Sequence, residues 1–319
     1  MKKYIATEKK DTRSGFGAAL YQIGEKNEKV VALCADLTGS LKMDDFAKAF
    51  PNRFIQTGIA EANMIGIASG LAIGGYIPFA GTFANFASGR VYDQIRQVVA
   101  YSNKNVKIAA SHAGISLGED GATHQTMEDI GLMRLLPNMT VINPCDYNQT
   151  IMATVAAADY MGPVYLRFGR PAVPNFTSLT SPFTIGQAIL LEEGTDVTII
   201  ATGHLVWKAL EACDILNEQG IHAEVMNIHT IKPLDEKSIR SSVIKTHCVV
   251  TAEEHLKNGG LGDAVAQFLS SDFPVPIELV AMNDCFGESG TPDELMTKYG
   301  LTTEAIVAAS QRAIARKNS

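Results

Sequence analysis

Short apolar runs alternate with amphipathic segments through the first half of the chain. The runs are rich in Val, Ile, Ala and Phe and are followed by polar residues, which is typical of buried parallel strands. They are predicted as strands at Val30–Cys34, Phe54–Thr57, Tyr76–Ala80, Val106–Ser111, Thr140–Asn143 and Val164–Phe168. The segments between them are predicted as helices at Arg13–Glu25, Ala60–Ile73, Phe86–Tyr101, Met127–Leu136 and Asn148–Ala158. This alternation predicts an α/β fold with a mostly parallel sheet and helices on both faces.

A stretch rich in proline, serine and threonine, Pro171 to Pro182, precedes a second α/β pattern. The strands of this second pattern are predicted at Val197–Ala201, His222–Met226, Val249–Ala252 and Ile277–Val280. Its helices are predicted near Leu205–Glu218, Asp235–Thr246, Leu261–Leu269, Asp293–Tyr299 and Thr303–Arg316. We therefore expect two α/β domains, at residues 1–176 and 189–319, joined by a linker at 177–188, with the second domain the smaller.

A long stretch without charge, from Ala62 to Gly89, raises the question of a membrane span. Such a span needs about 20 mostly apolar residues, whereas Gly74-Gly75 and Pro78 interrupt this stretch. We interpret it as a buried helix, a turn and a buried strand, and expect no membrane association. Its glycines at four-residue spacing, up to Gly74, favour close packing against another helix, including one across a subunit interface.

Composition and charge exclude several classes of function. The 319 residues are 46% hydrophobic and 19% charged, which fits an ordinary folded protein with a sizeable core, and the net charge of −7 argues against nucleic acid as a partner. The five cysteines are widely spread without a CxxC pair, so we expect reduced thiols in a cytoplasmic protein. The basic start is not followed by an apolar region, and we expect no secretory signal.

The richest chemistry lies in the glycine-broken segment Ser111–Gln125, which holds His112, His124, Glu119 and Asp120. Because the segment follows a predicted strand, its side chains are expected at the carboxyl edge of the sheet, where open α/β sheets bind ligands. Imidazoles and carboxylates there can move protons near neutral pH. A solvated loop that carries two histidines is the alternative from composition alone.

Two further predicted strands run into polar chemistry, with Asp36 after the first strand and Arg167 near the end of another. In the second half, the segment His255–Gly260 is consistent with anion binding at a helix N-terminus or with a glycine-rich turn. The turn is favoured because no second polar group converges there in sequence.

Five motifs in this order resemble the transketolase family: Gly58–Met64 (GIAEANM), Gly81–Phe86 (GTFANF), Gly118–Gln125 (GEDGATHQ), Ile231–Asp235 (IKPLD) and Thr251–His255 (TAEEH). The resemblance covers essentially the whole chain. It matches only the back part of a full-length transketolase, which comprises the pyrimidine-binding domain and the C-terminal domain.

The resemblance implies a thiamine-diphosphate-dependent enzyme that moves a two-carbon ketol unit from a ketose phosphate to an aldose, with central pentose phosphates as the default. The family binds the diphosphate with Mg²⁺ or Ca²⁺ through a Gly-Asp-Gly motif followed by an Asn, and this motif is absent here. The chain therefore looks like the C-terminal subunit of a split transketolase. A partner chain is expected to supply the metal ligands, and the assembly is expected to be a dimer of heterodimers.

The resemblance also assigns residues to the cofactor. Glu61 matches the glutamate that contacts the ring nitrogen of the aminopyrimidine, and Phe86 matches the aromatic that stacks on it, with Phe83 lining the same pocket. Asp36 opens a segment that resembles a turn near the cofactor, and His124 matches a position near the cofactor amino group. Without the resemblance, Glu61 fits a first-turn glutamate favoured by the helix dipole, and the phenylalanines fit a helix core.

For the substrate, four separated residues resemble the family's sugar-phosphate clamp: Arg13, Ser40, His112 and Arg167. Arg170 lies close to Arg167 and competes for the same role. Asp120 matches an aspartate that reads a substrate hydroxyl, and His124 is expected to transfer a proton or to hydrogen-bond a developing alkoxide. Glu61, His124 and His112 are the predicted catalytic residues, and this chain is expected to provide no metal ligand.

Three alternatives stay open. A beta subunit of a 2-oxo acid dehydrogenase has a similar domain plan, and a fragment of a 1-deoxyxylulose-phosphate synthase shares the glutamate and the Asp-Gly-x-Thr-His core. A non-catalytic scaffolding or regulatory subunit is the third. The joint presence of Glu61, Asp120, His124 and the arginines favours the catalytic interpretation.

Overall fold

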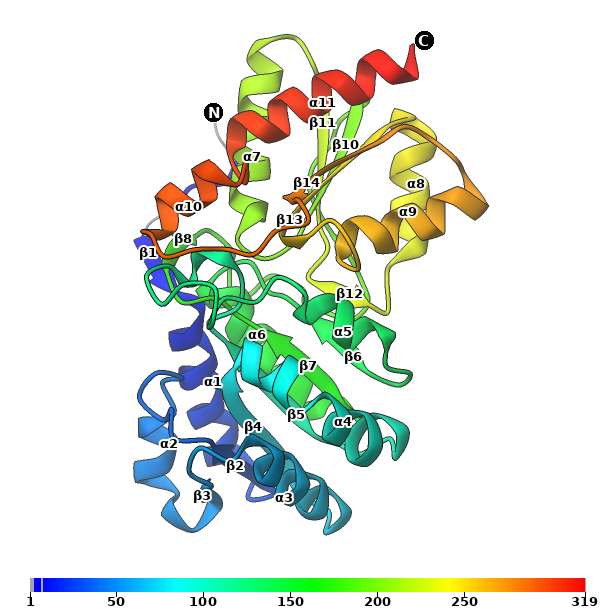
Figure 1. Ribbon diagram of the computed structural model, residues 1–319. Helices are drawn as coiled ribbons and strands as arrows, with labels where there is room; N and C mark the ends of the chain where they lie inside the picture. The colour runs from blue at the N-terminus through cyan, green and yellow to red at the C-terminus, as the bar shows by residue number, and fades with distance from the viewer. Residues whose placement is uncertain (1–2, 7, 319) are drawn as a thin grey trace.

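The computed structural model of the chain describes residues 3–6 and 8–318. Two α/β units lie one above the other in Figure 1, the first coloured from blue to green and the second from yellow-green to red. The predicted fold class is confirmed, because each unit is built on a sheet of mostly parallel strands with helices on both faces.

The first unit contains a seven-stranded sheet in the order β12-β6-β7-β5-β4-β2-β3, and every pair except β12·β6 is parallel. Its strands are β2 (Val30–Cys34), β3 (Phe54–Gln56), β4 (Ile77–Phe83), β5 (Lys107–Ser111), β6 (Thr140–Ile142), β7 (Val164–Arg167) and β12 (Thr230–Lys232). The six strands predicted from the first half are all present. Their apolar residues are buried on both faces because helices cover the sheet from both sides.

The helices of this unit are α1 (Thr12–Lys26), α2 (Asp44–Ala49), α3 (Glu61–Ile73), α4 (Tyr92–Gln94), α5 (Asp129–Leu135) and α6 (Tyr147–Asp159). Short 3₁₀ turns occur at η1 (Pro51–Arg53) and η4 (Ile115–Leu117). The helix predicted over Phe86–Tyr101 is instead two π-helical segments, η2 (Phe86–Arg90) and η3 (Ile95–Tyr101), on either side of α4. π-Helical turns inside helices are rare and often occur at functional sites.

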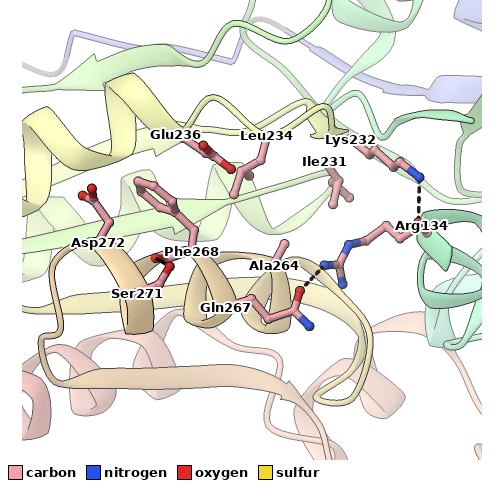
Figure 2. A pocket seen from close by; sticks show the side chains of 10 residues that line it. All are labelled: Arg134, Ile231, Lys232, Leu234, Glu236, Ala264, Gln267, Phe268, Ser271 and Asp272. Atoms are coloured by element: carbon pink, nitrogen blue, oxygen red, sulfur yellow. Dashed lines mark hydrogen bonds between the residues drawn. The ribbon is translucent and has the colours of Figure 1, made fainter. Parts of the chain in front are cut away.

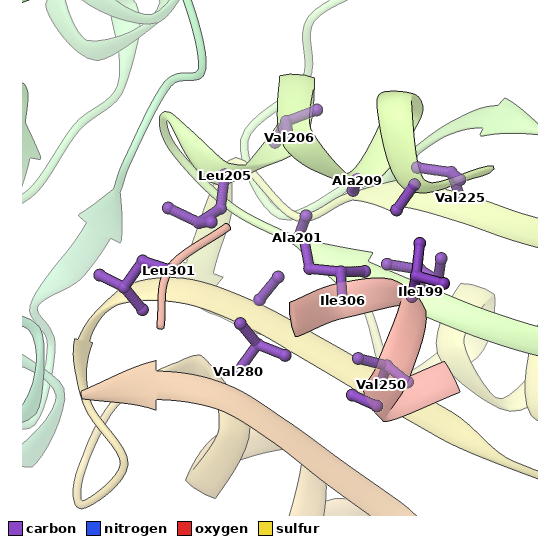
Figure 3. Packing of buried hydrophobic residues seen from close by; sticks show 14 of the residues in the cluster. Ile199, Ala201, Leu205, Val206, Ala209, Val225, Val250, Val280, Leu301 and Ile306 are labelled. Carbon is purple, nitrogen blue, oxygen red and sulfur yellow. The ribbon is translucent and has the colours of Figure 1, made fainter. Parts of the chain in front are cut away.

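The second unit has a five-stranded sheet in the order β14-β13-β10-β11-β9, in which only β9 is antiparallel to its neighbour. Its strands are β9 (Ile189–Glu192), β10 (Val197–Ala201), β11 (Ala223–Asn227), β13 (Val249–Leu256) and β14 (Ile277–Met282). Its helices are α7 (Leu205–Glu218), α8 (Glu236–Thr246), α9 (Leu261–Asp272), α10 (Pro292–Lys298) and α11 (Thr303–Lys317). In Figure 3 side chains of α7 and α11 pack against the central strands, with Ala201, Val225 and Val250 buried among them.

Several short elements do not follow from the hydrophobic pattern: α2, β9, β12 and the two-stranded ribbon of β1 (Glu8–Asp11) and β8 (Ala172–Asn175). Each ribbon strand has only four residues, polar in β1 and interrupted by Pro174 in β8, so neither carries an alternation that would predict it. β8 lies inside the Pro171–Pro182 stretch and ends just before the predicted linker, whereas residues 176–188 contain no helix or strand. β12 follows β11 in the chain but pairs with β6 of the other sheet, which ties the two units together.

The charge-free stretch forms α3 and β4, as predicted. Among the described residues, no helix combines the length and apolar character that crossing a membrane requires. Gly66 and Gly70 have open space beside their Cα atoms, so the helix-to-helix packing predicted for this face of α3 is not made within the described chain.

Candidate functional site

Four neighbouring parallel strands bring the predicted site residues to one edge of the first sheet. These strands lie side by side in the order β7-β5-β4-β2, and each pair is parallel. Asp36, Phe83, His112 and Arg170 lie at or just beyond their carboxyl ends. The sequence-based placement of the site at this edge therefore agrees with the structure.

Glu61 is the first residue of α3, and its side chain is only 3% exposed. Arg90, at the end of η2, donates from Nη1 to Glu61 Oε1 at 2.9 Å. The Arg90 guanidinium also lies over the Phe86 ring, 4.2 Å from the ring centre. The helix N-terminus and the guanidinium together compensate the burial of a carboxylate, which is costly without partners.

Sequence reasoning missed Arg90. The available signal was its position four residues after Phe86, which places the two side chains on one side of a wide helical turn.

Aromatic rings connect Glu61's surroundings to the histidines. Phe83 lies parallel to Phe86 at 5.9 Å between ring centres and stacks on His112 at 3.8 Å. His124 meets Phe86 edge-on at 5.6 Å. The cofactor residues predicted from the motifs, Asp36 aside, thus form one continuous group that includes rings and a carboxylate.

His112 is buried and adopts a left-handed backbone conformation, with φ of 60°. Its Nε2 lies 3.4 Å from Arg13 Nη1, and its Nδ1 lies 2.8 Å from Ser111 Oγ. Because arginine can only donate, Nε2 accepts and Nδ1 carries the proton. Burial, reinforced by the charges of Arg13 and Arg170, lowers the His112 pKa to about 3, so the ring is neutral at physiological pH.

Arg13 and Arg170 form a cationic cluster with the neutral His112 at this edge. Arg13 donates to the backbone carbonyl of Ser40 at 3.0 Å and lies near enough to Arg170 for the two charges to repel. Arg170 donates to Leu117 O at 2.9 Å, and its side chain is 38% exposed. Two guanidinium groups brought together with an imidazole are suited to bind an anion.

The structure contradicts the predicted role of Arg167 in holding a sugar phosphate. Its side chain is 4% exposed, it pairs with Asp129 at 2.9 Å, and it donates to the carbonyl of Glu254 at 2.9 Å. The competing candidate, Arg170, lies beyond the end of β7 and reaches solvent. The correction follows from position, since Arg167 is still inside the strand and under the second unit.

The remaining predicted site residues differ in their contacts. Ser40 contributes its carbonyl to Arg13, while its hydroxyl makes no hydrogen bond in the described chain. Asp36 and Asp120 are exposed, and within the residues that the structure covers their carboxylates have no hydrogen bond or ion pair. These two carboxylates remain free to meet a ligand.

Contacts with the second unit hold the histidine loop in place, and they use motif residues to which no role was assigned from the sequence. Glu254 Oε1 accepts from Ser116 N at 2.6 Å, and Gln125 donates to the carbonyls of Gly118 and Glu288. On the first unit, Asn85 donates to the carbonyl of Thr123 at 2.7 Å. The loop that carries Asp120 and His124 is therefore fixed from both sides.

The turn predicted at His255–Gly260 is confirmed in preference to an anion site. The backbone N–H groups of Leu261 and Gly262, at the start of α9, donate to Glu253 at 2.6 and 2.7 Å. The chain's own carboxylate thus fills the helix N-terminus, and burial raises the pKa of Glu253 to about 7.

A groove of about 590 Å³ between α5, β12 and α9 lies at the junction of the two units (Figure 2). Its cations are already engaged: Lys232 donates to the carbonyls of Arg134 and Leu136, and Arg134 donates to those of Gly259 and Gly260. This groove lies where the two units join, and backbone carbonyls already occupy both of its cations.

The cluster at the sheet edge fits one end of an aromatic, nitrogen-containing cofactor. A buried carboxylate can meet a ring nitrogen, Phe86 and Phe83 offer ring faces, and His124 adds a polar group beside them. Within the described ranges, no group of three or more His, Cys, Asp or Glu side chains is arranged to hold a metal ion.

Comparisons with known proteins agree with this geometry. The family model described as "Transketolase, pyrimidine binding domain" matches residues 8–175, and "Transketolase, C-terminal domain" matches residues 186–306. The chain is 46% identical to a 6-deoxy-6-sulfo-D-fructose transketolase subunit of a Clostridium species, over 94% of this chain and 93% of that protein. It is 38% identical to one of the subunits of the apulose-4-phosphate transketolase of Phocaeicola vulgatus, over 92% and 94%.

A solved structure described as "Split gene transketolase, inactive beta4 tetramer" has 50% identity and a TM-score of 0.91, covering 96% of this chain and 99% of that one.

Proposed function

The chain belongs to the transketolase family, and we propose that it is the C-terminal subunit of a split, thiamine-diphosphate-dependent transketolase. The observation that carries the proposal is the continuous group from Glu61 through Phe86, Phe83 and His112 to Arg13. In this group a carboxylate and aromatic rings suited to a cofactor lie directly beside arginines suited to an anion. The names of relatives that align along almost their full length support the subunit character.

At the cofactor end, Glu61 holds the ring nitrogen of the aminopyrimidine, and Phe86 and Phe83 fix the plane of the ring. Thiamine diphosphate, when bound, supplies a carbon nucleophile for addition to a ketose carbonyl. His124 lies at the edge of Phe86 and provides a proton or a hydrogen bond at the reacting oxygen. Asp36 lies at the same edge of the sheet, after β2.

At the substrate end, Arg13 and Arg170 hold the terminal anion of the sugar. The neutral His112 lies between the Phe83 ring and the Arg13 guanidinium. Ser40 positions Arg13 through its carbonyl. Asp120 accepts from a substrate hydroxyl. Because guanidinium pairs bind tetrahedral oxyanions through several hydrogen bonds, this end fits a sugar phosphate or a sugar sulfonate.

The same proposal includes features outside this chain. A partner chain carries the diphosphate-binding domain and the Mg²⁺ or Ca²⁺ ligands, and the assembly is a dimer of heterodimers in the cytoplasm. Pentose phosphates are the default donor and acceptor.

A ketol-transfer assay tests the proposal. Xylulose 5-phosphate and ribose 5-phosphate are supplied with thiamine diphosphate and Mg²⁺, first to this chain alone and then to the chain co-purified with the product of its neighbouring reading frame. Activity only in the pair is expected. A second donor arm with 6-deoxy-6-sulfo-D-fructose distinguishes a phosphate from a sulfonate. Turnover of pyruvate would instead favour a 2-oxo acid dehydrogenase or a 1-deoxyxylulose-phosphate synthase.

The variant Glu61→Ala separates catalysis from scaffolding. Loss of the carboxyl that meets the ring nitrogen is expected to lower kcat by about 100-fold or more. Complex formation, followed by gel filtration, is expected to persist. Full activity of Glu61→Ala in a complete complex would leave only the non-catalytic interpretation.

A further inference from the structure

The proposed function assigns no role to Arg90, although its side chain contacts both Glu61 and Phe86 in the candidate site. Arg90 donates to Glu61 at 2.9 Å while its guanidinium lies 4.2 Å from the centre of the Phe86 ring. Arg90 is itself 51% exposed, whereas the Glu61 side chain is 3% exposed. A half-exposed cation thus covers the two groups that are assigned to the cofactor ring.

The guanidinium makes the same two contacts that an aminopyrimidine would make. Both groups are flat, both can lie against a phenyl ring, and both can present an N–H to a carboxylate. Glu61 and Phe86 lie on separate elements, at the start of α3 and in η2, so a group that touches both fixes their separation.

The helical spacing accounts for the position of Arg90. η2 spans Phe86–Arg90, and residues four apart lie on nearly the same side of a helix. Arg90 therefore lies above Phe86, with its guanidinium directed at the N-terminus of α3.

We propose that Arg90 is an internal substitute for the aminopyrimidine ring, a positioning residue that holds Glu61 and Phe86 while the site is empty and moves into solvent when the cofactor binds. This inference rests on the proposed function, because it takes Glu61 and Phe86 as the cofactor contacts. It adds a competition between a side chain of this chain and the cofactor.

The energetics fit a displaceable partner. A carboxylate as buried as Glu61 is unstable without a counter-ion, so the empty site requires one. Arg90 can leave at little cost because half of its surface already contacts water. The apparent Kd for the cofactor then equals the intrinsic Kd divided by the fraction of molecules in which Arg90 has left the site.

The test measures thiamine diphosphate binding by equilibrium dialysis, with Mg²⁺ and the co-purified complex. In Arg90→Met the competitor is removed, and the cofactor Kd is expected to fall by about 3- to 10-fold. Arg90→Lys keeps the charge without the flat face, and its Kd is expected between those of Arg90→Met and the wild type. Arg96→Met, which changes an exposed arginine of the neighbouring segment η3, is the matched control with unchanged Kd.

Hydrogen exchange gives a second readout that does not depend on activity. Without cofactor, amides at the start of α3 and in η2 are expected to exchange faster in Arg90→Met than in the wild type. With saturating cofactor, the two proteins are expected to exchange alike. If Arg90→Met does not assemble with its partner, Arg90→Lys decides by the direction of its Kd change.

Weaker or unchanged cofactor binding in the Arg90 variants would overturn the inference. This failure is distinct from a failure of the proposed function, which appears as an absence of thiamine diphosphate binding in the wild-type complex. If the wild-type complex binds thiamine diphosphate and Glu61→Ala weakens that binding, the proposed function stands. The Arg90 variants alone then test whether Arg90 competes with the cofactor.

Discussion

Arg167 and Arg170 lie three positions apart, yet they belong to two different kinds of charged cluster. Arg167 is inside β7 and makes a buried network with Asp129, Tyr165 and the carbonyl of Glu254. Arg170 lies beyond the strand, contacts Leu117 O and Glu119, and reaches solvent. The buried network joins the two units, whereas the cluster of Arg13, His112 and Arg170, called the open cluster below, reaches solvent through Arg170 and is proposed to bind a ligand.

The difference shows that one residue type performs two tasks according to its neighbours. A buried arginine with a carboxylate partner has no capacity left for a substrate, and its removal leaves the partner's charge stranded. A half-exposed arginine with a weak surface partner can exchange that partner for a substrate anion. The comparison therefore predicts stability effects at one cluster and binding effects at the other.

The largest expected effect comes from Arg167→Met. It leaves Asp129 buried without its counter-ion, and the free energy of unfolding is expected to fall by about 3–5 kcal/mol. Urea denaturation followed by circular dichroism measures this change. The matched double variant Arg167→Met/Asp129→Leu removes both charges and is expected to recover part of the loss. A single variant as stable as the wild type would refute the buried-network assignment.

The next effect concerns Arg170→Met in the open cluster. Loss of one guanidinium from the anion site is expected to raise KM for the phosphorylated donor by about 10- to 100-fold, since a charge-assisted hydrogen bond contributes about 1.5–3 kcal/mol. The unfolding free energy is expected to change by less than about 0.5 kcal/mol. Steady-state kinetics with the complete complex gives KM, and urea denaturation gives stability. An unchanged KM would remove Arg170 from the substrate site.

A smaller expected effect is on the pH dependence of the unfolding free energy, because each cluster has a neutral histidine in it or beside it. Burial lowers the pKa of His112 to about 3 in the open cluster and of His255 to about 4 beside the buried network. In the unfolded chain both titrate near a pKa of about 6.5. The native state therefore binds fewer protons than the unfolded chain below about pH 6.5. The stability that each neutral histidine contributes is complete above that pH and is lost as the pH falls to about 4 for His255 and to about 3 for His112.

Comparison of His112→Gln with the wild type isolates this contribution. The variant is expected to lose less stability between about pH 7 and about pH 5, by on the order of 1 kcal/mol. Glu253, whose pKa burial raises to about 7, acts in the opposite direction but equally in both proteins. Parallel pH profiles of the two proteins would mean that His112 takes up its proton over the same pH range in the native and unfolded states, so that its pKa is not lowered by folding.

The smallest effect is expected at Glu119, the exposed partner of Arg170. An exposed ion pair contributes about 0–1 kcal/mol, so Glu119→Gln is expected to leave stability unchanged within about 0.5 kcal/mol. Because the pair competes with the substrate anion for Arg170, KM is expected to fall by up to about 3-fold at low salt. A rise in KM would show that Glu119 orients Arg170 and does not compete for it.

Much of this site was predictable because its signals are local. Apolar runs followed by polar residues predicted Asp36, His112 and Arg167 near the carboxyl edge, and the order of the motifs identified the family. Glu61 begins α3 as the motif indicated, and the glycine-rich turn before α9 was correctly preferred to an anion site. The assignment of ligand roles to Glu61, Asp36, Asp120 and His124 stays a prediction.

The sequence by itself determined the alternation of strands and helices, and with it the edge where the site lies, because each buried strand is marked by its own run of apolar residues. Only the tertiary structure decided that β12 joins the other sheet, that Arg167 is buried and Arg170 open, and that Arg90 pairs with Glu61. These outcomes depend on which charges and strand edges meet across distant parts of the chain. Such long-range contacts leave no periodic signal in the sequence, because the packing of the whole chain determines which residues come into contact.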